Sequence, residues 1–159
     1  MNRAYYISMN TNETMSQIEI NKAIIQRYFE AYNNKNETIF DDIISPDYTD
    51  HGQSAYMGSP GRGVSGAKND LKNSLDKLDD SNYVVEALIA SPWYPDLVGA
   101  YWKGSSTPKL TSDTQQTSKI INVRGVSIYR IQNGKMVETW HVVDGVLPKI
   151  FGQKTITKK

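Results

Sequence analysis

The sequence of 159 residues predicts one α+β domain in which helices come first and antiparallel strands follow. Apolar residues recur at helical spacing in the first half, whereas from Tyr83 onward they alternate with polar ones. Asn133-Gly134 then separates two long alternating stretches, as is typical of a type I′ hairpin turn. We expect the helices to pack on the concave face of one strongly curved sheet.

The first helix is expected to begin at Ser16. Ser16-Gln17-Ile18-Glu19 has the pattern of a capping box, and Met15 and Ile20 are placed for a hydrophobic staple. The apolar stripe of this helix is formed by Ile18, Ile24, Ile25, Tyr28, Phe29 and Tyr32. We expect residues 1–15 to be a flexible extension, residues 16–152 to form the single domain, and residues 153–159 to be a flexible tail.

Two shorter helices should follow. The apolar residues between Ile39 and Ile44 predict a helix that Ser45-Pro46 ends. Residues 47–52 should form a short strand or bend, and the glycine-rich residues 52–63 a loop. A third helix is expected from near Ser65, with its apolar stripe formed by Leu71, Leu75 and Leu78.

Four strands are expected after the helices. The first has the alternating residues Tyr83, Val85, Ala87 and Ile89, and the second has Val98, Ala100 and Trp102 on one face. Polar residues 104–118 should form a loop. The apolar residues 146–151 suggest a last helical turn.

The last two strands pair outward from the turn at Asn133-Gly134. Regular pairing sets Ile131 against Met136, Tyr129 against Glu138, and Ser127 against Trp140. Because side chains alternate along a strand, one face carries Glu138, Trp140, Val142 and Asp144, and the other carries Thr139, His141 and Val143. We expect the first of these faces to line a partly polar pocket, and we expect Glu138 to pair with Arg130 or Lys135.

This hairpin also carries a family resemblance. An apolar strand (Ile128 to Ile131), a Gly-containing turn, Glu138-Thr139-Trp140 and then Asp144 resemble the C-terminal hairpin of SnoaL-like proteins. That family includes polyketide cyclases within the nuclear-transport-factor-two-like superfamily. The resemblance extends back to about Ile18. It implies a cone-shaped, curved mixed or antiparallel sheet around a long N-terminal helix and two shorter helices, the cystatin-like or SnoaL-like roll, and it implies a homodimer.

The resemblance also implies a function. SnoaL-type cyclases use an aspartate as acid and base on a carbon acid, and that role falls on Asp144. We expect His51 to join it as a catalytic residue. The candidate substrate-binding residues are Tyr28, Tyr32, Tyr48, Trp102, Trp140 and His141. A regular strand would put His141 on the outer or dimer face, whereas a β-bulge would turn it towards the pocket.

The composition excludes other classes of function. The chain has no cysteine, and its 18 basic and 17 acidic residues give a formal net charge of +1. Disulfides and thiolate metal sites are therefore impossible, and no field attracts nucleic acid or membranes. No apolar run is long enough to span a membrane, and the first residues lack a leader pattern, so we expect a cytoplasmic protein. No His-x-x-x-His or phosphate-binding loop is present, so we expect neither metal nor cofactor.

The sequence leaves three functions open. The first is a cofactor-free cyclase or isomerase that transfers a proton next to a carbonyl. The second is a non-catalytic module that binds a hydrophobic small molecule in the same cone. The third is a structural dimer whose cavity is vestigial. The loop at residues 104–113 lacks the Pro-Thr-Gly pattern usual in the cyclases, so the pocket mouth should differ from theirs.

Overall fold

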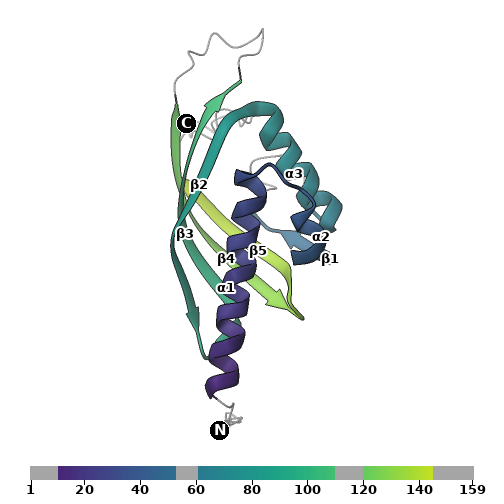
Figure 1. Ribbon diagram of the computed structural model, residues 1–159, viewed down its shortest axis with the longest axis vertical. Coiled ribbons are helices and arrows are strands. Elements are labelled where there is room, and N and C mark those ends of the chain that lie inside the picture. Colours follow the sequence, from purple (N-terminus) through teal and green to yellow (C-terminus); the bar gives the residue numbers. More distant parts are fainter. Residues whose placement is uncertain (1–10, 53–60, 110–119, 145–159) are drawn as a thin grey trace, which may run out of the picture.

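The fold is α+β, as predicted: a mixed five-stranded sheet curves around the N-terminal helix (Figure 1). The computed structural model describes residues 11–52, 61–109 and 120–144. Within these residues the elements are α1 (Thr11–Asn33), α2 (Ile39–Ile43), β1 (Ile44–Asp50), α3 (Gly63–Lys77), β2 (Leu78–Ser91), β3 (Tyr94–Pro108), β4 (Ile121–Gln132) and β5 (Lys135–Asp144). The strand order is β1-β5-β4-β3-β2, and β1 runs parallel to β5.

Helix α1 lies along the concave side of the sheet and buries the predicted stripe. Two asparagines attach it to the sheet: the Asn21 amide donates to the carbonyl of Pro95 at 2.8 Å, and Asn33 exchanges two hydrogen bonds with the backbone of Tyr83. The predicted start of the helix was wrong. Ser16 already lies within α1, and Met15 and Ile20 are half exposed, so neither a capping box nor a staple forms there.

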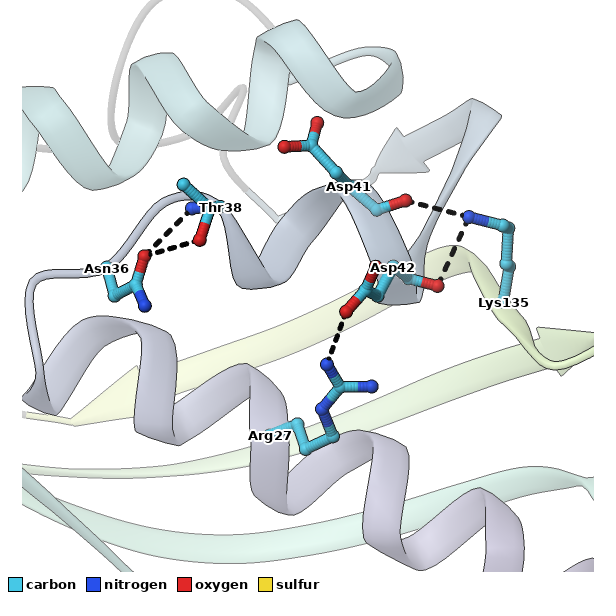
Figure 2. A network of polar contacts seen from close by, with 6 residues as sticks. All are labelled: Arg27, Asn36, Thr38, Asp41, Asp42 and Lys135. Atoms are coloured by element: carbon cyan, nitrogen blue, oxygen red, sulfur yellow. Dashed lines mark hydrogen bonds and ion pairs between the residues drawn. The ribbon is translucent and has the colours of Figure 1, made fainter.

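A polar network fixes α2 between its neighbours (Figure 2). The Lys135 ammonium at the hairpin turn donates to the carbonyls of Asp41 and Asp42, at 2.9 and 3.1 Å, in the last turn of α2. A cation here stabilises the negative end of the helix. The Arg27 guanidinium of α1 binds the Asp42 carboxylate at 2.7 Å, and Lys68 of α3 binds Asp41 at 2.8 Å.

Strand β1 begins where α2 ends, so Ser45-Pro46 lies inside a strand instead of a loop. Proline is tolerated because β1 is an edge strand. Helix α3 starts at Gly63, where φ is +61° and a Cβ atom would collide with the Pro46 carbonyl. The buried face of α3 carries Ala67, Asp70, Leu71 and Ser74.

Strands β2 and β3 form a long antiparallel hairpin. Val98, Ala100 and Trp102 of β3 are buried, as predicted. The predicted alternation along β2 was wrong beyond Val85. Glu86 is an extra residue in the pairing, and this bulge turns Ile89 outward, where it is 68% exposed. Strand β3 also continues to Pro108, into the segment predicted as a loop.

The hairpin of β4 and β5 has the predicted turn. Asn133 and Gly134 have φ values of 51° and 73°, as a type I′ turn requires. Ile131 pairs with Met136, but two of the predicted pairs were wrong: Tyr129 pairs with Thr139 and Ser127 with His141. Val137 is an extra residue in β5, and this bulge shifts every later pair by one.

No helix in the described ranges is long and apolar enough to cross a membrane. The predicted last turn at residues 146–151 lies outside the described residues, as does most of the predicted glycine-rich loop.

Candidate functional site

The bulge at Val137 decides which side chains of β5 face the helices. Beyond it, Thr139 is buried and His141 is largely covered, whereas Asp144 is exposed. The inner face of β5 is therefore the one that carries Thr139, His141 and Val143. The predicted pocket face, with Glu138, Trp140 and Asp144, is the outer face of the sheet.

The inner face brings His141 to Asp50. Asp50 is the last residue of β1 and only 1% exposed, and its Oδ1 lies 3.7 Å from Nδ1 of His141. The same Oδ1 accepts the backbone N–H of Gly52 at 2.8 Å. A Cβ atom on Gly52 would lie 2.5 Å from the ring of His141, so only glycine permits this close approach. The carboxyl group of Asp50 and the backbone of Gly52 thus limit where the imidazole can lie.

Three tyrosines pack in the same core. The hydroxyl of Tyr48 donates to Oγ1 of Thr139 at 3.1 Å, and the hydroxyl of Tyr28 contacts that of Tyr32 at 3.4 Å. Burial, with a smaller contribution from the negative charge of Asp50, raises the pKa of Tyr28, Tyr32 and Tyr48 above the ordinary value. These phenols therefore stay protonated at neutral pH and act as hydrogen-bond donors.

A second carboxyl group enters from α3. Asp70 is 8% exposed, and its Oδ2 occupies the place where a Cβ atom of Gly61 would be. The carbonyl of Gly61 accepts the backbone N–H of Asp50 at 3.0 Å, so Gly61 contacts the side chain of Asp70 and the backbone of Asp50. Burial, and then the negative charge of Asp50, raise the pKa of Asp70 to about 7. We call Asp50, Asp70, His141, Tyr28, Tyr32 and Tyr48 the interior cluster.

His51 and Trp140 lie on the outer side of the sheet, contrary to their predicted places at the pocket. The two rings stack in parallel with centroids 4.8 Å apart, and His51 is exposed. Glu138 accepts from Nε2 of His51 at 3.2 Å and pairs with Arg130 at 3.1 Å. The predicted pairing of Glu138 with Arg130 is confirmed. His51 directly follows β1 and its backbone N–H still donates to the Thr139 carbonyl at 2.8 Å, so the alternation that turns Asp50 inward turns His51 outward.

Asp144 does not lie at the pocket that we predicted for it. It is an exposed residue at the end of β5, paired across the ladder with Arg124. The physical reason is again the bulge, which turns Asp144 away from the helices. Of the other predicted residues, Trp102 faces inward, and its Nε1 donates to Oγ of Ser127 at 2.9 Å.

The sequence prediction gave no site role to Asp50 or Asp70. A signal for Asp70 was present, because it lies between the apolar positions Ala67 and Leu71 on the buried face of α3. No group of three His, Asp or Glu side chains in the described ranges has the geometry to hold a metal ion.

A curved mixed sheet packed around a long N-terminal helix, with two shorter helices beside it, defines the class of α+β roll. The sequence comparison then gives the family. The profile of SnoaL-like polyketide cyclases matches residues 22–148, so the chain belongs to this family. No curated protein sequence matches the chain significantly.

Solved structures of similar fold share little sequence with this chain. A proposed polyketide cyclase from Acidithiobacillus ferrooxidans is 23% identical, with a TM-score of 0.67 over 82% of this chain and 92% of that one. IdmH from Streptomyces antibioticus, a proposed polyketide cyclase, is 20% identical, with a TM-score of 0.67 over 78% and 91%. AclR from Streptomyces galilaeus, a proposed hydroxylase, is 19% identical, with a TM-score of 0.63 over 87% and 89%. At this level of identity the likeness shows the fold alone.

Proposed function

We propose that the protein binds a neutral, hydrophobic carbonyl compound against the interior cluster and transfers a proton at the carbon next to the carbonyl. The observation that carries this proposal is the contact between His141 and Asp50 inside the cone. An imidazole beside a buried carboxyl group can act as a base that removes a proton from carbon. Membership of the SnoaL-like polyketide cyclase family supports the same chemistry.

The proposed step needs no co-reactant. The C–H bond breaks, its proton passes to the Asp50–His141 pair, and its electron pair forms an enolate. A tyrosine hydroxyl donates a hydrogen bond to the enolate oxygen. The enolate then regains the proton, which is isomerisation or exchange, or its carbon attacks a second carbonyl of the same molecule and closes a ring. In that case the new alkoxide takes the proton back from the pair.

The charges inside the cone favour a neutral substrate. Among the described residues the buried polar side chains include two aspartates, but no lysine or arginine. A carboxylate or phosphate would meet negative charge without a cation to balance it, and burying such a charge is costly. We therefore expect ketones and keto esters to bind and keto acids to bind poorly.

We further propose that two copies pair through the outer face of the sheet, in keeping with the family resemblance. Tyr101, Val126 and Val142 lie side by side on neighbouring strands of this face, and all three are exposed. Such an apolar strip in a two-fold dimer would cover itself. A cytoplasmic location stays a prediction from the composition.

The test is deuterium exchange from heavy water into cyclic ketones and β-keto esters, followed by mass spectrometry against a blank without protein. The proposal predicts protein-dependent exchange in at least one neutral compound and less exchange in acetoacetate. Absence of exchange throughout the panel would contradict the catalytic proposal. Thermal stabilisation by the same compounds without exchange would instead support the non-catalytic binding module.

A further inference from the structure

The proposed function gives roles to His141, Asp50 and the tyrosines but leaves Asp70 without one. This carboxyl group is buried on α3, where apolar neighbours would be expected. A buried acid lowers stability unless something compensates for it. The residues around Asp70 are therefore informative about its use.

Because Gly61 has no side chain, it leaves space for the carboxyl group of Asp70. Its φ lies outside the left-handed region, so the backbone itself does not require glycine. What requires glycine is space: a side chain at Gly61 would displace the Asp70 carboxyl group, and one at Gly66 would collide with the backbone of Gly61. The close contact between α3 and the segment before it brings Asp70 next to the backbone that holds Asp50.

The two aspartates cannot both be charged at little cost. Asp50 faces His141 at 3.7 Å and accepts the Gly52 N–H at 2.8 Å. The charge of Asp50 in turn opposes ionisation of Asp70. Environments that separate two neighbouring carboxyl groups in this way divide the roles of acid and base between them.

We propose that Asp70, in its protonated form, is a catalytic residue that donates a hydrogen bond to the carbonyl oxygen of the substrate as the enolate forms. This inference rests on the proposed function. The Asp50–His141 pair takes the proton from carbon, and the Asp70 hydroxyl faces the negative charge that develops on oxygen. No atom is lost or gained, because Asp70 keeps its proton throughout. An ionised Asp70 would repel the enolate, so the active form has one charged aspartate and one neutral one.

The other groups near Asp70 support this assignment. Tyr32 of α1 stays protonated, since burial raises its pKa and the Asp70 charge adds to that rise. From β2 comes Tyr83, whose pKa burial raises. From α2 comes Asp41, which is exposed and bound to Lys68. The charge that controls Asp70 is therefore that of Asp50, because Asp41 is exposed and already paired.

The experiment compares wild type with Asp70→Asn and Asp70→Ala in the exchange assay between pH 5.5 and 8.5. Because Asp70 has a pKa of about 7, wild-type exchange should fall at higher pH. Asparagine cannot ionise and still donates a hydrogen bond. Asp70→Asn should therefore catalyse exchange at a rate that does not fall at higher pH. Alanine donates nothing, so Asp70→Ala should lose about 100-fold below pH 7 and progressively less above it, where the wild type itself loses the donor. An Asp70→Asn profile with the same fall as wild type would overturn the inference.

A second measurement works without substrate and on the wild-type protein. Carbon-13 labelling of aspartate lets NMR follow each carboxyl group, and the Asp70→Asn spectrum identifies the signal of Asp70. The inference predicts that this group is protonated at pH 6 and ionised at pH 8.5. A signal that is already ionised at pH 6 overturns it. If the wild type catalyses no exchange but Asp70 titrates as expected, the proposed function has failed and the role of Asp70 in catalysis fails with it.

Discussion

At the scale of single residues, glycines decide where the functional side chains can lie. Gly52 admits the ring of His141, Gly61 admits the carboxyl group of Asp70, and a Cβ atom on Gly125 would collide with the indole of Trp102. None of the three has a positive φ, so each is needed for a close approach and not for a turn. The interior cluster is therefore sensitive to the addition of single methyl groups.

Gly52→Ala should displace His141 from Asp50 while the fold is kept. A shift of about 1 Å in a catalytic group costs on the order of 100-fold in rate, so we expect a loss of that size in the exchange assay. Gly99→Ala is the matched control, since its Cβ would have its nearest neighbour at an ordinary 3.6 Å. Equal rates for the two variants would show that the place of His141 does not matter.

Asp70 should make stability depend on pH. Its pKa is raised from 3.8 to about 7, so between these values the folded protein holds a proton that the unfolded chain has lost. The free energy of unfolding therefore falls as pH rises through this range. The free energy of unfolding of Asp70→Asn, measured by urea unfolding and compared with that of wild type, should be more favourable at pH 8 than at pH 5. The exposed Asp76→Asn on the same helix should show no such change, and a flat difference for Asp70→Asn would contradict the assignment.

At the scale of elements, the sequence predicted the helices and strands well and their faces less well. Hydrophobic spacing found the buried stripe of α1 and the buried face of β3, and Asn133-Gly134 found the turn. The bulges at Glu86 and Val137 carry no sequence signal that period-two alternation can reveal, because each is one residue without a ladder partner. For this reason the face of Asp144 was predicted wrongly.

Lys135 should contribute more to the stability of the fold than an ordinary surface lysine does. It donates to two carbonyls at the end of the helix. We expect Lys135→Met to lower the free energy of unfolding by about 1–2 kcal/mol, measured by urea unfolding. Lys103→Met removes an exposed ion pair with Glu86 and should cost clearly less than Lys135→Met. Similar losses in both variants would argue against a special role for the helix end.

At the scale of the whole molecule, the outer face of the sheet should determine the oligomeric state. Val126→Lys places a charge in the middle of the apolar strip, so light scattering should find monomers where wild type forms dimers. Glu30→Lys on the exposed side of α1 is the control and should stay dimeric. A monomeric wild type would contradict the dimer, and a dimeric Val126→Lys would place the interface elsewhere.

We propose that the carboxyl group of the reacting pair belongs to Asp50, inside the cone, and not to Asp144, on the outer face of the sheet. The most direct test measures solvent deuterium exchange into a responsive ketone with Asp50→Asn and Asp144→Asn beside wild type. Both substitutions keep the shape of the side chain and remove its charge. We expect the exchange rate of Asp50→Asn to be at least about 100-fold lower than that of wild type, and the exchange rate of Asp144→Asn to be unchanged. Loss in Asp144→Asn with full exchange in Asp50→Asn would contradict it.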